Sequence, residues 1–171
     1  HTNDRRQRQM CIRDRNYHCF LMPIHYTQQK EQYHITTDTA TFDLDVIHGY
    51  LTHSYWKRGV PKNLVAQAVA NALCFGLFER DQQIGFARII TDYTDFAYLC
   101  DVFVLEAYQG NGLGAWLIET VIAHPGLQSV RNLSLGTRDA QEFYRKFGFQ
   151  EMDQPNRWMI KLQDRPWYIP D

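Results

Sequence analysis

The sequence predicts an α/β fold in one domain, and three observations support this. The run from Phe96 to Val104 is aromatic, β-branched and apolar, as in a buried strand. A glycine-rich turn follows, and apolar residues then recur at helical spacing from Leu113 to His124, where Pro125 ends the helix. The chain has 171 residues, of which 44% are hydrophobic and 14% aromatic, and this is enough for one sizeable core.

The same patterns locate the other elements along the chain. They predict a first strand, two helices interrupted by Gly59-Val60-Pro61, and two strands joined as a hairpin through Arg80–Gln83. Beyond the strand and helix above, they predict one more strand, a short helix and a final strand pair. The expected bounds are, in chain order, Tyr33–Thr37, Leu44–Tyr55 (capped by Thr41 or Asp43), Leu64–Ala72, Cys74–Glu79, Ile84–Thr91, Phe96–Val104, Leu113–His124, Val130–Leu135, Ala140–Phe147, Phe149–Met152 and Trp158–Lys161.

The first residues differ from the rest of the chain. Residues 1–15 hold five arginines and two aspartates, without an apolar period or a helix cap. Met10–Arg15 resembles the in-frame translation of a sequencing-library adaptor, so we expect residues 1–21 to be non-native or disordered and residues 22–171 to form the domain, with Met22 as the start. The alternative is a basic arm that binds nucleic acid or membrane. Genomic DNA that encodes residues 1–21 in frame would contradict the adaptor interpretation.

Composition excludes several function classes. Residues 1–15 carry a net charge of +3 and the whole chain −1, so the remainder carries −4. We therefore expect no nucleic-acid partner. No run of eighteen apolar residues exists, so we expect no membrane span. The four cysteines, Cys11, Cys19, Cys74 and Cys100, lack metal-ligand spacing, which favours free thiols in the cytoplasm and no metal.

The glycines of Gln109–Gly114 lie in the turn between the strand and the helix. Such a turn exposes backbone N–H groups at the positive end of a helix, where phosphates bind. A P-loop needs Gly-Lys-Ser/Thr here, and a dinucleotide fingerprint needs G-x-G-x-x-G; this chain has Gly110, Gly112 and Gly114 as G-x-G-x-G. A tight turn without a ligand is the alternative.

Two stretches resemble the signatures of the GNAT acyltransferases. Val104–Gly114 is similar to the family's acetyl-coenzyme A signature, a strand followed by Gln/Arg-x-x-Gly-x-Gly/Ala. Ala140–Phe149 is similar to its second signature, a short helix ending in Tyr-x-x-x-Gly-Phe. The resemblance covers Tyr33–Lys161, and Thr137 departs from it because many members carry Asn there.

The resemblance implies a fold and a cofactor. The fold is a mixed, mostly antiparallel central sheet with helices on both faces and a bulged, splayed central strand near Val104. Acetyl-coenzyme A is the implied acyl donor, with no metal. Its expected contacts are the end of the central strand and the glycine turn, namely Val102, Phe103, Val104, Gln109, Gly110, Asn111, Gly112, Leu113, Gly114 and Ala115.

The resemblance also implies catalytic and substrate residues. Tyr144 matches the family's general acid beside the coenzyme sulfur, and a core tyrosine is the alternative. Asp101 is the candidate base for the amine proton, or a sheet residue that only positions substrate. Tyr55 and Trp56 are expected to wall the acceptor pocket or, alternatively, to form a satellite core. Tyr98 aligns with the acidic base of histone-acetylating relatives, and its being tyrosine argues against that substrate class.

These features together predict an N-acetyltransferase. The acceptor is expected to be a small primary amine that attacks the thioester directly in a ternary complex, since Cys100 has no neighbouring histidine that would activate it for a covalent route. Two alternatives stay open: a protein N-terminus or lysine as acceptor, and a coenzyme A-binding sensor without turnover. The sequence also leaves open whether the chain forms a homodimer.

Overall fold

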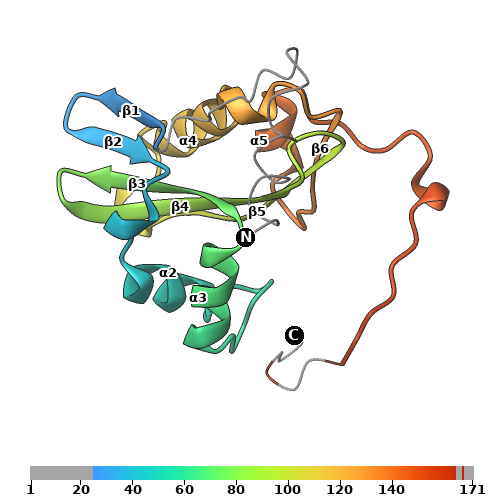
Figure 1. Cartoon of the computed structure of the whole chain (residues 1–171), viewed down its shortest axis with the longest axis horizontal. Helices are drawn as coiled ribbons and strands as arrows, with labels where there is room; N and C mark the ends of the chain where they lie inside the picture. The colour runs from blue at the N-terminus through green and yellow to red at the C-terminus, as the bar shows by residue number, and fades with distance from the viewer. Residues whose placement is uncertain (1–24, 165–166, 168–171) are drawn as a thin grey trace, which may run out of the picture.

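The computed structural model describes residues 25–164 and residue 167, so the predicted non-native segment 1–21 lies outside the described residues. Its strands form one sheet in sequential order, in which neighbours from β1 to β5 are antiparallel and β6 is parallel to β5 (Figure 1). The mixed, mostly antiparallel sheet is therefore confirmed. The strands are β1 Thr27–Lys30, β2 Tyr33–Thr36, β3 Leu73–Glu79, β4 Gln82–Thr91, β5 Phe96–Val104 and β6 Asn132–Leu135.

Helices cover both faces of the sheet. α2 (Leu44–Leu51) and α3 (Lys62–Ala70) lie on one face, and α4 (Leu113–Ile122) and α5 (Gln141–Arg145) lie on the other (Figure 1). Each face has its own apolar core. The α2–α3 core contains Ile47, Leu51, Val65, Phe86 and Phe103, and the α4 core contains Leu77, Ile84, Leu99, Leu117 and Ile118.

Local chemistry explains where the first helices begin. Of the two candidate caps, Asp43 is the one that caps α2, because its carboxylate accepts from the N–H groups of Asp45 and Val46. Pro61 precedes α3 with φ −66°, the value that its ring imposes, and it has no N–H group to leave unpaired. The two helices are joined by residues 52–61, which include Tyr55, Trp56 and Lys57.

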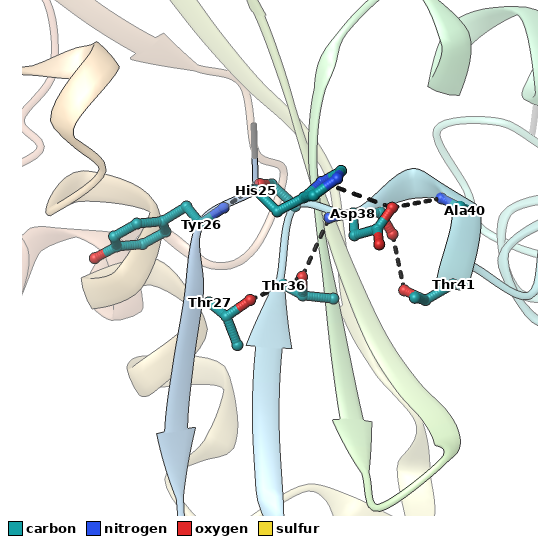
Figure 2. Close-up of polar contacts among 8 residues, drawn as sticks. His25, Tyr26, Thr27, Thr36, Asp38, Ala40 and Thr41 are labelled. Atoms are coloured by element: carbon teal, nitrogen blue, oxygen red, sulfur yellow. Dashed lines mark hydrogen bonds and ion pairs between the residues drawn. The ribbon is translucent and has the colours of Figure 1, made fainter. Parts of the chain in front are cut away.

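Strand β1 was not predicted from the sequence. Its residues are polar and fully exposed, so they lack the apolar alternation that marks a half-buried strand. It pairs with β2 along the backbone, and Thr27 Oγ1 also donates to Thr36 Oγ1 (Figure 2). Just outside the two strands, the Tyr26 N–H donates to Thr37 Oγ1. Beyond β2, Asp38 caps the 3-10 turn η1 (Thr39–Thr41), where its carboxylate accepts from the Ala40 N–H at 3.1 Å (Figure 2).

The central strand β5 is bulged, as expected. Phe86 of β4 pairs with Phe103, and Arg88 pairs with Cys100, so β5 has one more residue than β4 between these pairs. The extra residue is accommodated at Asp101, whose φ of 55° lies in the left-handed region that Asp tolerates better than most residues. The bulge therefore fixes the position of Asp101 on β5.

The strand is also splayed from its other neighbour. β6 pairs with β5 only from Phe96↔Asn132 to Leu99↔Leu135. Within the described residues, Cys100–Val104 therefore has β4 on one side and no paired strand on the other.

The predicted final strand pair is wrong. Residues 149–164 contain no strand, and their regular structure is the 3-10 turn η4 (Pro155–Arg157). The Trp158 ring contacts the Phe96 ring at 5.9 Å, whereas Met159 and Ile160 are 95% and 83% exposed. A strand needs a hydrogen-bonded neighbour and a face to bury, and apolar composition alone supplies neither.

Other elements differ from prediction mainly at their ends. The β3–β4 hairpin turns through two residues, Arg80 and Asp81, because β4 already begins at Gln82, before the expected Ile84. α2 ends at Leu51, and α5 spans five residues and is followed by Gly148 at φ 86°. In the part of the chain that is described, no helix has the length and hydropathy needed to cross a membrane.

Candidate active site

The glycine turn before α4 presents backbone rather than side chains. Gly110 and Gly112 have φ values of 81° and 76°, where other residues are strained, and the space beside both α-carbons is open for 4 Å. Gly112 occupies the N-cap position of α4, and no side chain caps the helix. The N–H groups of Leu113, Gly114 and Ala115 precede the first intrahelical bond, from the Trp116 N–H to the Gly112 carbonyl. Such a helix end binds anions, phosphate in particular.

The turn is anchored to the end of β5. Gln109 donates from Nε2 to the Val104 carbonyl oxygen at 2.8 Å, and Asn111 donates weakly to the Tyr108 carbonyl at 3.5 Å. Gly114 lies against Val104 and Phe143, both at ordinary van der Waals distance from where a Cβ would be. The predicted cofactor residues of the strand and the turn are therefore brought together, beside the unpaired edge of Cys100–Val104.

Tyr144 lies on α5 among aromatic rings. It makes edge contacts with Phe143 at 5.1 Å and Phe149 at 5.8 Å. Burial raises the pKa of its phenol to about 12, and Tyr55 contributes in the same direction. The hydroxyl is thus protonated throughout the physiological pH range, which is what a proton donor needs.

A cavity of about 650 Å³ adjoins Tyr144. Its walls are β6, one side of α5 and the segment Phe149–Asp153. The cavity follows the outer edge of β6, which is an edge strand of the sheet, and the glycine turn does not line it. Tyr144 therefore has open space beside it.

The second catalytic candidate, Asp101, lies in a buried ion network. Its Oδ2 accepts from Lys57 Nζ at 2.8 Å and from Arg88 Nε at 2.7 Å, and its side chain is only 2% exposed. Its other oxygen, Oδ1, is buried and has no hydrogen-bond partner within the described part of the chain. An unpaired buried carboxylate oxygen is costly, so this atom is a candidate to meet a ligand.

Lys57 and Arg88 were missed in the sequence. Lys57 belongs to the α2–α3 connection, 44 residues from Asp101 along the chain, and Arg88 lies in the middle of β4, 13 residues from Asp101. One signal was available, because Arg88 interrupts the otherwise apolar run Ile84–Ile90, and a charge in a buried strand requires a partner. The sequence could not say which acid would pair with it.

The predicted acceptor residues Tyr55 and Trp56 lie in the same connection as Lys57. Tyr55 accepts from the Arg138 N–H at 3.2 Å, and the Arg138 guanidinium lies 3.8 Å from the centre of its ring. Trp56 contacts Tyr50 and packs against the α2–α3 core, while its indole Nε1 is buried without a hydrogen-bond partner in the described structure. Trp56 thus has the contacts of a core residue together with one unused donor.

Tyr98 lies on β5, three residues before Asp101. Burial raises the pKa of its phenol, and the backbone of Gly136 partly opposes that shift. A Cβ at Gly136 would lie 3.2 Å from the Tyr98 hydroxyl, so glycine leaves room for this contact. Thr137, the departure from the family pattern, accepts from the Ala140 N–H at the start of α5. No group of three His, Cys, Asp or Glu side chains among the described residues is arranged to hold a metal ion.

Comparison with known proteins gives three informative similarities. The chain is 37% identical to a GNAT-family protein from Xanthomonas campestris pv. campestris, whose crystal structure it matches with a TM-score of 0.73 over 87% of this chain and 96% of that one. It is 35% identical over 101 residues to the [ribosomal protein bS18]-alanine N-acetyltransferase of Haemophilus influenzae, covering 57% of this chain and 66% of that protein. A GNAT acetyltransferase from Elizabethkingia anophelis, solved with acetyl-CoA bound, shares the fold at 20% identity, with a TM-score of 0.58 over 72% of this chain and 80% of that one.

The family model for the acetyltransferase (GNAT) domain matches residues 70–151. This range runs from the end of α3 to the segment after α5, and it includes the glycine turn, Asp101 and Tyr144. Together with the similarity in sequence and structure to the Xanthomonas protein over 87% of this chain, the match shows that this chain belongs to the GNAT family of acetyltransferases and is an acyltransferase.

Proposed function

We propose that this protein moves the acetyl group of acetyl-CoA to the primary amine of a small molecule, by direct attack of the amine in a ternary complex. The observation that carries the proposal is the construction of β5. Within the described residues, β5 has no paired strand on one side from Cys100 to Val104, leads into the glycine turn, and holds at its bulge a buried carboxylate with one oxygen that has no partner.

Acetyl-CoA, when bound, supplies a thioester whose carbonyl carbon is open to nucleophiles. The unpaired N–H groups of Leu113, Gly114 and Ala115, with the open backbone of Gln109–Gly112, fit its pyrophosphate. The free edge at Val102, Phe103 and Val104 fits the amide groups of a pantetheine arm, and one of its N–H groups would polarise the thioester carbonyl.

Tyr144 is proposed as the general acid. As the amine nitrogen bonds to the carbonyl carbon and the carbon–sulfur bond breaks, the departing thiolate takes the phenolic proton. With a pKa of about 12 the phenol is protonated at neutral pH, so a proton is available when the thiolate forms. A purely structural role in the Phe143–Phe149 cluster is the alternative.

Asp101 is proposed as the base that receives the amine proton, directly or through a water. Lys57 and Arg88 occupy Oδ2, so the proposal assigns the proton to Oδ1, the oxygen without a partner. Tyr55, Trp56 and Tyr98 are proposed as walls of the acceptor pocket around it.

A direct route is favoured over a covalent acetyl-enzyme. Cys100 lies on β5 next to Asp101, and burial raises the pKa of its thiol to about 11. Very little of such a thiol is ionised near neutral pH, and the thiolate is the nucleophilic form. The free thiols of Cys74 and Cys100 also support our proposal that the protein works in the cytoplasm.

The test is turnover of acetyl-CoA by the full chain, read as free thiol over a broad panel of amines. The Tyr144→Phe and Asp101→Asn variants are each expected to lower kcat about 100-fold or more. Matched controls are Tyr93→Phe and Asp139→Asn, which change an exposed tyrosine and an exposed aspartate. Full activity in both site variants would contradict the assigned roles.

The same panel separates the alternatives. A protein N-terminus is the second candidate acceptor, favoured by the similarity to the bS18-alanine N-acetyltransferase, so N-terminal alanyl peptides belong in the panel. Turnover of peptides but not of free amines would replace the small-molecule proposal. Binding of acetyl-CoA with no thiol release on any acceptor would indicate a sensor instead.

A further inference from the structure

The ion network around Asp101 carries an excess of positive charge. Lys57 and Arg88 supply two cations and Asp101 one anion, and the two cations share a single oxygen. The other titratable groups around the cluster are Tyr98, Cys74 and Cys100. Burial raises the pKa of the two thiols to about 12 and about 11, and it raises that of the phenol, so all three are neutral at pH 7 and do not compensate the charge.

The Arg88 guanidinium has more N–H donors than it uses in hydrogen bonds to the described residues. A guanidinium has five N–H groups, and within the described residues the one hydrogen bond of this side chain runs from Nε to Asp101. The side chain is only 10% exposed, so water can satisfy its remaining donors only in part. The two terminal nitrogens form the flat fork that binds a carboxylate through two parallel hydrogen bonds.

Asp101 complements this arrangement with a free acceptor. Its Oδ1 is buried and unpartnered, while Lys57 and Arg88 hold the carboxylate in place through Oδ2. One small region of the protein therefore combines an unused acceptor for an ammonium group with unused donors for an anion. A ligand that carries both groups a few bonds apart would satisfy both.

We propose that the acceptor is an amino acid or a close analogue, in which a carboxylate lies next to the amine that is acetylated. The inference rests on the proposed function and narrows its substrate class. The amine meets Asp101 Oδ1, and the carboxylate meets the terminal nitrogens of Arg88, with Lys57 adding positive charge. Polyamines are disfavoured, since they bring more positive charge to a cluster that already has an excess.

The experiment uses matched acceptors on the unmodified protein. Phenylalanine, phenylalaninamide and phenethylamine share a side chain and an amine, and differ in having a carboxylate, an amide or nothing; leucine and glutamate are tested with their amides in the same way. We expect kcat/KM for an amino acid to exceed that for its amide about 10- to 100-fold. Equal or better use of the amides and of phenethylamine would overturn the proposal.

The Arg88→Gln variant tests the assigned residue, with Arg80→Gln as control because Arg80 lies in the exposed β3–β4 turn. Arg88→Gln should reduce the preference for the amino acid over its amide to about one, whereas Arg80→Gln should keep it. Should Arg88→Gln not fold, the comparison of acceptors on the unmodified protein still decides the matter.

Calorimetry in the presence of coenzyme A separates this inference from the proposed function. Thiol release with amides but not amino acids would support the function and overturn the inference. If no acceptor is turned over although acetyl-CoA binds, the proposed function fails. The inference then depends on whether phenylalanine or leucine binds at least 10-fold more tightly than its amide, and equal binding would overturn it.

Discussion

Two neighbouring regions of β5 differ in the groups that they offer to a ligand. At its C-terminal end, β5 leads into a turn whose proposed ligand-binding groups are backbone amides, held in place by two glycines at positive φ and by one hydrogen bond from Gln109. Three residues earlier, at the bulge, the strand holds Asp101 in a network of charged side chains from three separate parts of the chain. The first region is open and nearly free of side chains, and the second is buried and charged.

The difference shows how each region will respond to change. Backbone amides bind whatever the neighbouring side chains are, so the glycine turn depends mainly on conformation. A buried ion network depends on every partner, because removal of one charge leaves the others without compensation in a medium of low dielectric constant. The bulge should therefore be important for stability as well as for catalysis, and the turn mainly for binding.

The largest expected effect is on the bulge. Asp101→Ala leaves Lys57 and Arg88 buried without their counterion, and we expect it to lower the free energy of unfolding by about 3–5 kcal/mol. Asp139→Ala removes an aspartate from an exposed pair and should change stability by less than about 0.5 kcal/mol. Urea unfolding of both variants checks the difference. Equal, small losses would show that the bulge does not depend on its charges.

The glycine turn should lose binding more than stability. Gly112→Ala places a side chain at φ 76°, where the cost is about 1–2 kcal/mol, and the open space around it adds no clash. The variant is expected to unfold at slightly lower urea concentration and to bind coenzyme A at least 10-fold more weakly, because relief of the strain shifts the amides that start α4.

Gly148→Ala is the matched control for this change. Gly148 has φ 86° and the same open surroundings, so the loss of stability should be similar, but it lies after α5 and outside the turn. Coenzyme A binding, measured by calorimetry, should stay close to that of the unmodified protein. Equal loss of binding in the two variants would mean that the turn acts through stability alone.

The reactivity of the thiols near the bulge measures how far water is excluded from that region. Burial raises the pKa of Cys74 to about 12 and that of Cys100 to about 11, from an ordinary value of 9.0. At pH 8 both should therefore react with iodoacetamide about 100-fold or more slowly in the folded protein than in urea. Peptide mass spectrometry after timed quenching measures the two rates. Fast labelling of Cys100 in the folded state would show that water enters the bulge.

The smallest expected effect concerns His124, on the opposite face of the sheet. Its ring is 4% exposed, packs against Tyr26 and Phe75, and accepts from the Gly126 N–H through Nδ1. Burial lowers its pKa below the ordinary 6.5, so the unfolded chain takes up the proton first as pH falls. This contribution to stability is present above pH 6.5 and is lost as pH falls through the lower folded-state pKa.

His124→Gln should remove that part of the acid sensitivity. The free energy of unfolding of the variant, measured from pH 7 to 5, is expected to fall less steeply than that of the unmodified protein. Parallel curves would assign the acid sensitivity to other groups.

Several features could be predicted from the sequence because they depend on neighbouring residues. The glycine turn needs only a buried strand, glycines at positive φ and an apolar helix, and all three lie within Phe96–Ile122. The same holds for α5 with its Tyr144 and Gly148. Prediction failed for two segments. β1 is a strand although its residues are polar and exposed, and Trp158–Lys161 forms no strand although most of its residues are apolar.

The sequence by itself determined the family, the order of most elements and the position of the glycine turn, since each follows from contiguous residues and their backbone preferences. Only the tertiary structure decided which groups surround Asp101. Lys57, Arg88 and Asp101 come from a loop and two strands that meet through sheet register and helix packing, and no local pattern encodes such a meeting. These charged side chains are of types that usually lie on the surface. Here they are buried and paired with one another, because a charge removed from water is costly unless it has a partner.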